Sequence, residues 1–298
     1  MKKILTFIFI CILLPLQALY SSGQTNQSKS SQPQSNPSNQ AQVFAGSAMA
    51  GMDALFSRQE ASLEDEYYLG RAVAANILNN YKPYTVNQAL TAYLNRICQT
   101  IVINSSHPII FNGYHVLVLD SPEFNAFATP GGHVFITRGL VEAATSEDML
   151  AALIAHELSH IMLKHGMRLI DDMDIFMQAA QAASMGQALS GSASANRLME
   201  YRNSVASIID TMIKNGYSHE YEFEADREAV KLLASAGYDP AALVEMLKVL
   251  QRVQTSQRGG FNATHPTPAA RITHVDSALR NIRVQDTNSY RTSRFKNK

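Results

Sequence analysis

The spacing of apolar residues predicts a chain that is mostly helical from Leu63 onward. Apolar side chains recur every three or four positions from Leu63 and again over Val86–Ile103, so two helices are expected before any strand. Thr145 is expected to cap a third helix and Gly166 to end it. The later helical segments are Thr145–His165, about Tyr217–Ala234 and Ala241–Val253.

Short extended runs separate the early helices from the later ones. His115–Leu119 is β-branched and ends at a turn-forming Asp-Ser-Pro sequence. Phe124–Ala128 and His133–Thr137 flank Pro130-Gly131-Gly132, a combination that predicts a β-hairpin. Helices, a small sheet and further helices in this order predict an α+β fold.

The N-terminus has the pattern of a secretory signal. Two lysines precede the apolar run Ile4–Leu16, and small residues follow it. A membrane-spanning helix needs about 20 apolar residues, and this run is shorter. We therefore expect a cleaved signal peptide over residues 1–23, a periplasmic or secreted location, and at most peripheral membrane association.

The remaining chain divides by composition. Residues 24–59 begin with a tract of Gln, Ser, Asn and Pro and are expected to form a polar linker. Residues 60–285 are expected to form one domain, and the polar residues 286–298 a flexible tail. Residues 171–216 are rich in small residues and are interpreted either as a helix pair or as a lid.

Charge and cysteine content exclude several classes of protein. The 298 residues include 25 basic and 25 acidic side chains, and this balance argues against a nucleic-acid-binding protein. Of the two cysteines, Cys11 lies in the expected signal, so Cys98 remains without an internal disulfide partner. Cys98 is expected to be a packed core residue. The oligomeric state is not indicated by the sequence.

The sequence His156-Glu157-Leu158-Ser159-His160 is the strongest candidate for chemistry. Residues four apart lie on one face of a helix, so the two imidazoles converge as half of a tetrahedral zinc site. Glu157 then reaches a metal-bound water. His165 projects to the opposite face of an unbroken helix and is not expected to be a ligand.

A third ligand is expected from the segment that begins at His219. Glu222 and Asp226 share a helical face with small alanines, which would let this helix approach the first one closely. Glu222 is one candidate ligand and His219 is its rival. Asp226 is placed to accept a hydrogen bond from a ligand imidazole and so to orient it.

These motifs together resemble the zinc metallopeptidases of family forty-eight, which include HtpX, periplasmic proteases of the BepA type and the CAAX prenyl proteases. The resemblance rests on the His156–His160 motif, on Glu222–Asp226, on Asn125–Ala128 with the following Pro-Gly-Gly, and on His265-Pro266 with Arg271. It implies a zincin-like (gluzincin) domain with its small sheet before the motif helix.

The resemblance also implies roles for individual residues. Zinc would be held by His156, His160 and Glu222, with Glu157 as general base. Asp226 would orient a ligand, and His265 or Arg271 would stabilise the oxyanion. His265 could alternatively be a fourth zinc ligand that keeps the enzyme latent.

A protease that acts on unfolded chains can hold its substrate as an added strand. Two segments qualify, one with Asn125, Ala126 and Phe127 and the other with His133, Val134 and Phe135; the sequence does not distinguish the edge strand. We therefore predict a zinc-dependent endopeptidase for misfolded or unfolded polypeptides. The alternatives are a non-catalytic zinc-containing chaperone or assembly factor, and a helical interaction protein in which the motif is coincidental.

Overall fold

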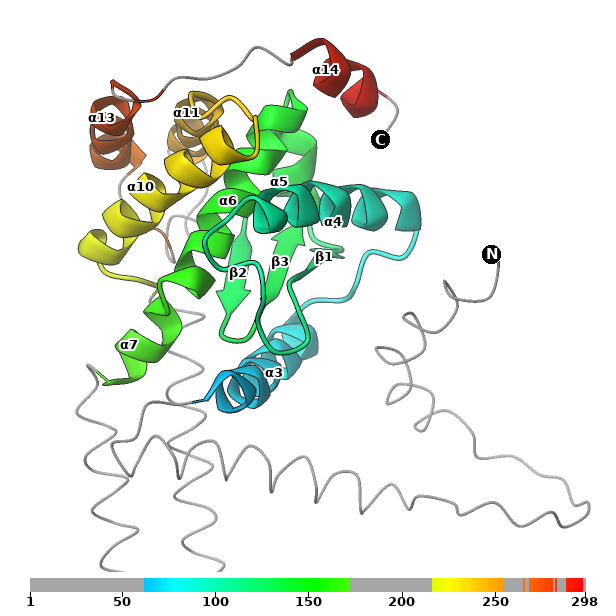
Figure 1. The fold of residues 1–298 in the computed structure, drawn as a ribbon. Helices are drawn as coiled ribbons and strands as arrows, with labels where there is room; N and C mark the ends of the chain where they lie inside the picture. The colour runs from blue at the N-terminus through cyan, green and yellow to red at the C-terminus, as the bar shows by residue number, and fades with distance from the viewer. Residues whose placement is uncertain are drawn as a thin grey trace, which may run out of the picture. The chain divides into compact units, whose positions relative to one another are not determined.

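A computed structural model describes residues 62–171, 216–254, 265, 268–280, 282 and 288–296. The expected signal peptide, the linker at 24–59 and nearly all of the possible lid at 171–216 lie outside these residues. Figure 1 shows the arrangement of the helices and strands. In chain order they are α3 (Leu63–Asn80), α4 (Gln88–Ile103), β1 (His115–Leu119), β2 (Ala126–Thr129), β3 (His133–Thr137), α5 (Arg138–Ala143), α6 (Glu147–Met162), α7 (His165–Asp171), α10 (His219–Ser235), α11 (Ala242–Gln254), α13 (Pro268–Leu279) and α14 (Asn288–Lys296).

The sheet has the strand order β1-β3-β2, with β3 in the centre. β2 and β3 form the antiparallel hairpin that the Pro-Gly-Gly turn predicts, with Phe127 opposite Phe135. β1 pairs with β3 in parallel, with His115 opposite His133. The described part of the chain therefore has the α+β organisation expected from the sequence, with helices before and after a small sheet.

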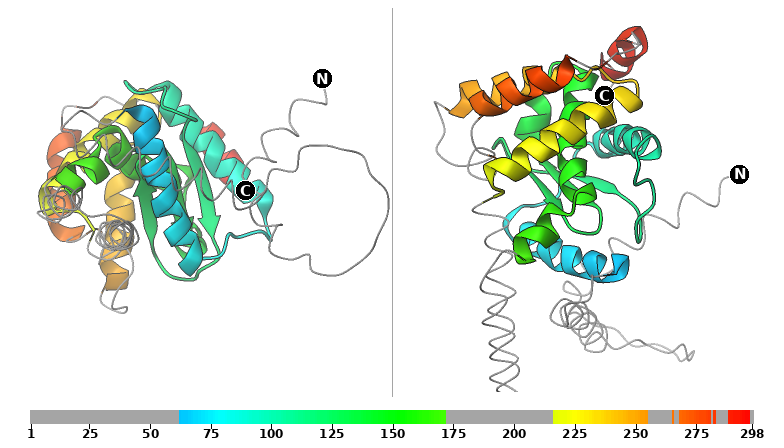
Figure 2. Two further views of the ribbon diagram at one scale, coloured as in Figure 1. Left: turned by 90° about the horizontal axis from the view of Figure 1, so that it is seen from below. Right: turned by 60° about the vertical axis from the view of Figure 1, so that its left-hand side comes forward.

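The two faces of the sheet pack on different helices (Figure 2). On one face Val134 and Ile136 join the large core formed with α4, α6, α10 and α11, which also contains the fully buried Cys98. On the other face Phe135 packs against apolar residues of α3 such as Val73. Successive β3 side chains point to opposite faces, so each strand residue serves one of the two cores.

Helix α6 is buried along its whole length, including the polar side chains of its motif. Small residues such as Ala152 and Ala155 on α6, and Ala225 and Ala229 on α10, are completely buried. Their size lets the two helices pack closely, as expected from the alanines near Glu222. Polar groups on such a helix must find partners, because burying them unpaired costs a few kcal/mol each.

Both ends of α6 differ from the sequence prediction. Ser146 caps the helix by accepting a hydrogen bond from the amide of Met149, whereas the Thr145 hydroxyl contacts the sulfur of Met149. The helix ends at Met162, and Lys164 has a left-handed backbone with φ of 55°. Gly166 therefore lies inside α7 and does not end the motif helix.

The hairpin turn is pressed against α3. A Cβ atom on Gly70 would lie 1.6 Å from the carbonyl oxygen of Pro130, and one on Gly131 would lie 2.3 Å from Cα of Tyr67. Gly131 also has a positive φ of 73°. Glycine is required at both positions because no side chain fits the contact.

The residues expected to form a flexible tail include a helix, α14. Arg291 on α14 binds Asp148, and Arg294 binds Glu147, so α14 is held at the first turn of α6. Periodicity of apolar residues does not reveal this contact because it consists of charged groups. Among the described residues, none of the helices is both long and apolar enough to cross a membrane.

Candidate metal centre

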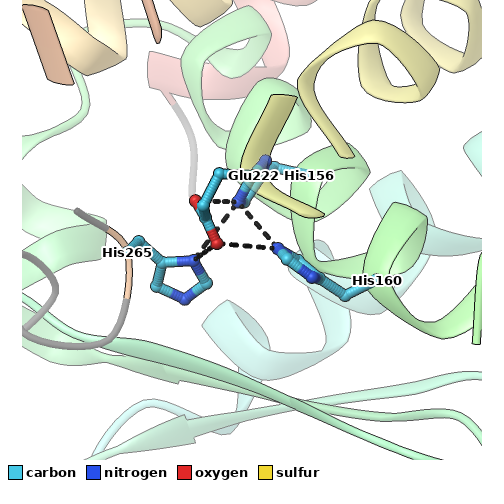
Figure 3. A group of neighbouring side chains, drawn as sticks. All are labelled: His156, His160, Glu222 and His265. Carbon is cyan, nitrogen blue, oxygen red and sulfur yellow. Dashed lines mark hydrogen bonds and ion pairs between the residues drawn. The ribbon is translucent and has the colours of Figure 1, made fainter. Parts of the chain in front are cut away.

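Helix α6 presents His156 and His160 on one face, and α10 places Glu222 opposite them. His265, from the chain between α11 and α13, approaches from a third direction, as Figure 3 shows. All four side chains are buried, and one potential ligand atom from each lies within 4.8 Å of the others. The structure thus brings together the three ligands expected from the sequence and adds His265.

The distances among His156, His160 and Glu222, and from His156 to His265, are close to those of a tetrahedral metal site. Nε2 of His156 lies 3.2 Å from Nε2 of His160 and 3.4 Å from Nδ1 of His265. Oxygens of Glu222 lie 3.5 Å from His156, 3.4 Å from His160 and 2.9 Å from His265. Ligands held about 2.0–2.2 Å from a central zinc ion would be separated by about 3.3–3.6 Å. Two or three imidazoles and one carboxylate are also ligands that zinc accepts.

Glu157 lies beside this group with its carboxyl completely buried. Neither of its oxygens has a hydrogen-bond partner among the described residues, and Nε2 of His265 is 3.7 Å from Oε1. Burial raises the pKa of this carboxyl above its ordinary value. Burying a carboxyl without a hydrogen-bond donor costs free energy. Because this carboxyl lies next to four possible ligand atoms, the arrangement indicates a site that accommodates a further group, such as a metal ion.

Asp226 and Arg271 orient the first imidazole. Oδ1 of Asp226 lies 3.0 Å from Nδ1 of His156, which leaves Nε2 facing the other ligand atoms. Arg271 donates to both oxygens of Asp226, at 2.8 and 2.7 Å, and its Nη1 lies 2.9 Å from Oε2 of Glu222. The oxyanion role expected for Arg271 from the sequence stays a prediction; in the structure its buried guanidinium is engaged with these two carboxylates.

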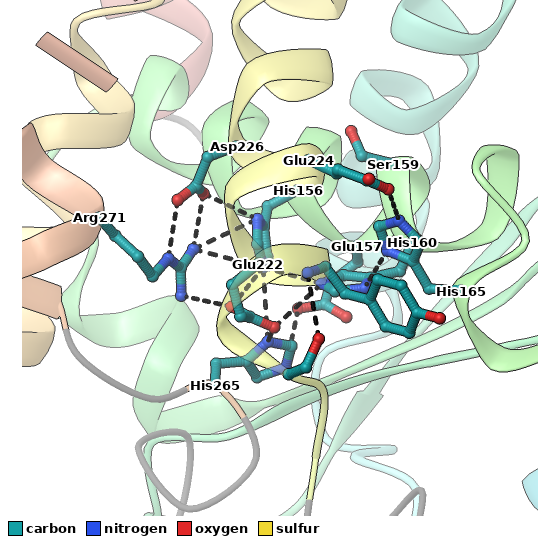
Figure 4. A network of polar contacts seen from close by, with 12 residues as sticks. His156, Glu157, Ser159, His160, His165, Glu222, Glu224, Asp226, His265 and Arg271 are labelled. Carbon is teal, nitrogen blue, oxygen red and sulfur yellow. Dashed lines mark hydrogen bonds and ion pairs between the residues drawn. The ribbon is translucent and has the colours of Figure 1, made fainter. Parts of the chain in front are cut away.

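The second imidazole has a different set of contacts, which the sequence did not suggest. Nδ1 of His160 lies 2.9 Å from Nδ1 of His165, and Nε2 of His165 lies 3.1 Å from Glu224 (Figure 4). His165 does not belong to the four possible ligands, as expected. It does not point away from the site, however, because the helix breaks at Lys164 before reaching it. Tyr217 stacks on His160 with ring centroids 4.1 Å apart.

The pKa values of two of the four side chains, His160 and Glu222, suit a bound cation. Burial lowers the pKa of His160 well below its ordinary value, so the ring is neutral. Burial alone would raise the pKa of Glu222, but the neighbouring His265 and Arg271 outweigh it and hold that pKa well below its usual range. A neutral imidazole and an ionised carboxylate are the forms that bind metal ions.

The sheet leaves one edge open near this group. β3 is paired on both sides, so the backbone of His133, Val134 and Phe135 is not available to a further strand, contrary to one of the two sequence interpretations. The outer edge of β1 is also occupied, since the side-chain amide of Asn95 binds both the N–H and the C=O of Val116. Among the described residues β2 has no second strand partner.

β2 adjoins the candidate metal centre. Asn125 accepts a hydrogen bond from the amide of Thr137, and the alternation of an antiparallel ladder therefore turns the backbone of Ala126 and Ala128 outward. A small pocket is lined by Ala128 and Thr129 at the end of β2 and by His160, one of the four possible ligands, with Tyr217. Of the predicted substrate-binding residues, Ala126 faces this open edge, whereas the backbone of Asn125 and Phe127 is turned toward β3.

His219, the rival third ligand, lies at the exposed start of α10, where its ring contacts Phe223. It is not among the four side chains that could hold a metal ion. His219 is the first residue of the helix and is exposed, whereas Glu222, three positions further on, is completely buried.

Comparison with protein families matches residues 88–279 to the model of peptidase family M48. This range includes the whole three-stranded sheet and all four possible ligands.

Two kinds of curated relatives are similar to this chain. The beta-barrel assembly-enhancing protease of Escherichia coli strain K12 is 27% identical over 228 residues, which cover 76% of this chain and 45% of that protein. The mitochondrial metalloendopeptidase OMA1 of Schizosaccharomyces pombe is 26% identical over 216 residues, which cover 70% of this chain and 57% of that protein. The similarity therefore spans about half the length of these relatives.

Proposed function

The chain belongs to peptidase family M48, and on that premise we propose that it is a zinc-dependent endopeptidase. Its substrates are misfolded or unfolded polypeptides of the periplasm or the secreted fraction, where it acts in protein quality control. The buried Glu157 carboxyl beside the converging atoms of His156, His160 and Glu222 carries this proposal.

In this function the three side chains would hold one zinc ion, and the ion would supply Lewis-acid chemistry, lowering the pKa of a water toward about 7 and polarising the scissile carbonyl. Glu157 accepts the proton of the attacking water and delivers it to the leaving amine. The pKa of Glu157, raised by burial, helps the carboxyl hold that proton between the two steps. Asp226 keeps Nε2 of His156 directed inward, and Arg271 holds Asp226 and Glu222 in place.

An unfolded chain binds by pairing with the open edge of β2. The outward carbonyl of Ala126 and the outward backbone groups of Ala128 supply hydrogen bonds that do not depend on the sequence of the substrate. The amide of Ala126 donates to Oδ1 of Asn125, at 3.0 Å. The pocket between β2 and His160 supports this placement, because a strand added there runs past the metal centre. Broad specificity follows from recognition through the backbone.

Glu157→Gln tests the assignment of the general base. The change keeps the size of the side chain and removes its ability to take a proton, so zinc content and thermal stability are expected to persist while casein cleavage is lost. Glu220→Gln, on the exposed side of α10, is the matched control and should cleave at the wild-type rate. Wild-type activity in Glu157→Gln would refute the proposed role.

The position of His265 favours a second candidate function. Its Nδ1 lies 2.9 Å from Glu222 and completes a closed set of four possible ligands, as in a latent enzyme or a zinc-containing chaperone or assembly factor. His265→Ala separates these alternatives. Increased casein cleavage indicates a latent protease, decreased cleavage indicates that His265 stabilises the oxyanion, and no cleavage by either protein under any condition favours the non-catalytic function.

A further inference from the structure

The Nδ1 atom of His160 contacts another imidazole, that of His165, whereas Nδ1 of His156 contacts the carboxylate of Asp226. Nδ1 of His165 lies 2.9 Å from Nδ1 of His160, and its other nitrogen lies 3.1 Å from Oε2 of Glu224. Arg168 donates to the same oxygen of Glu224 at 2.6 Å. Figure 4 shows His160, His165 and Glu224 in this order, leading away from the four possible ligands.

The contacts allow one consistent placement of protons. Nε2 of His160 faces Glu222 at 3.4 Å and must carry a lone pair to bind a metal ion, so its proton is on Nδ1. That N–H can donate only to an unprotonated Nδ1 of His165. The proton of a neutral His165 then lies on Nε2, where it donates to Glu224. Each nitrogen of His160 and His165 is thus either a hydrogen-bond donor or an acceptor in this series. Arg168 donates to the carboxylate of Glu224 at its end.

The backbone between α6 and α7 creates this arrangement. Lys164 adopts its left-handed conformation and binds Glu66 on α3, and the chain therefore changes direction before His165. His165 is completely buried, and Tyr221 stacks on it with centroids 4.7 Å apart and the planes inclined by 9°. The ring is thus fixed on its face by Tyr221 and at both of its nitrogens by hydrogen bonds.

Helix α10 supplies a carboxylate to the hydrogen-bond network of both imidazoles, His156 and His160. Asp226 on α10 contacts His156 directly and is held by Arg271. Glu224, two residues earlier on α10, is held by Arg168 and reaches His160 through His165. Each of the two imidazoles is therefore connected by hydrogen bonds to a carboxylate that is paired with an arginine. The connection is direct for His156 and passes through His165 for His160.

We propose that His165 is a positioning residue, which fixes the tautomer of His160 and directs Nε2 of that ring toward the metal ion, with Glu224 fixing His165 in turn. This proposal rests on the proposed function of His156, His160 and Glu222 as a zinc centre. Residues that orient a metal-bound histidine typically contribute about 10–100-fold to metal affinity.

The test compares His165→Phe with His165→Asn in the full-length protein. Phenylalanine keeps a flat ring against Tyr221 but accepts no hydrogen bond, whereas the side-chain oxygen of asparagine can accept the bond from Nδ1 of His160. Zinc affinity is measured by competition with a chromophoric chelator, and ligand geometry by the visible absorption of the cobalt-substituted protein. His219→Phe, which changes an exposed histidine, is the matched control.

We expect His165→Phe to weaken zinc binding by about 10–100-fold, to alter the cobalt spectrum, and to lower kcat with little change in KM. His165→Asn should recover most of the affinity, and His219→Phe should match the wild type. Zinc binding by His165→Phe within about twofold of the wild type, with an unchanged cobalt spectrum, would overturn the proposal.

If His165→Phe does not fold, Glu224→Met decides the question. It removes the acceptor for Nε2 of His165 and keeps a side chain of similar length. Weaker zinc binding supports the proposal, and unchanged binding overturns it. Failure of the proposed function gives a different result in the wild-type protein itself, which would then either bind no zinc or bind zinc without cleaving casein.

Discussion

The ion pair between Arg291 and Asp148 connects the C-terminal helix to the first turn of the motif helix. Nε of Arg291 lies 2.8 Å from Oδ1 and 2.9 Å from Oδ2 of Asp148, and the two side chains are only 6% and 10% exposed. Arg291 also donates to the carbonyl of Gly237, and Asp148 accepts a hydrogen bond from the amide of Asp239. Arg291→Met removes the cation and keeps much of the apolar stem.

Breaking a buried ion pair by removing one partner costs about 3–5 kcal/mol, because the remaining charge is left unpaired. Asp148 keeps the amide of Asp239 and lies at a helix N-terminus, where a negative charge is favourable, so we expect the lower value of about 3 kcal/mol. For a chain with 150–250 folded residues this lowers Tm by about 6–12 °C. Urea and thermal unfolding followed by circular dichroism measure both quantities.

A second variant separates lost charge pairing from lost packing. Asp148→Asn combined with Arg291→Met removes both charges, so the double variant should be more stable than Arg291→Met alone. Lys248→Ala breaks an exposed pair with Glu245 and should change stability by less than about 1 kcal/mol. The reasoning is refuted if Arg291→Met costs no more than Lys248→Ala, or if the double variant is the least stable of the three.

Three further changes test other contacts. Gly70→Ala should cost about 1–3 kcal/mol in urea unfolding because its Cβ meets the carbonyl of Pro130; unchanged stability would show that α3 and the hairpin turn do not pack as described. Asp226→Asn should weaken zinc binding by about 10–100-fold in a chelator competition, and affinity equal to the wild type would contradict its role in orienting His156. Removal of the metal with a chelator should lower Tm, because an ion that binds the folded state stabilises it; an unchanged Tm after confirmed metal removal would contradict a site formed by folding.

The features that the sequence predicted well depend on neighbouring residues in the chain. The 3.6-residue period placed His156 and His160 on one face, and the β-branched runs gave the exact bounds of β1 and β3. Alanines on α10 indicated the close approach that brings Glu222 to the motif helix. The position of His265 in this group could be inferred only through resemblance to a family, since no local pattern connects it to α6.

The features that were missed depend on distant contacts or unusual backbone. A positive φ is uncommon for lysine, so the break at Lys164 and the return of His165 to the site could not be read from residue types. The central position of β3 requires its parallel pairing with β1, which no hairpin pattern contains. Helix α14 is held by arginines that bind buried carboxylates, and a search for apolar periodicity does not detect such a helix.

The relation between bound zinc and hydrolysis tests the central claim most directly. Metal-free protein is titrated with zinc, and bound zinc per chain and the rate of casein cleavage are measured on the same samples. We predict that the rate rises in proportion to occupancy and reaches its maximum near one zinc ion per chain. Equal cleavage by the metal-free protein, or zinc binding without any hydrolysis under all conditions, would contradict the account.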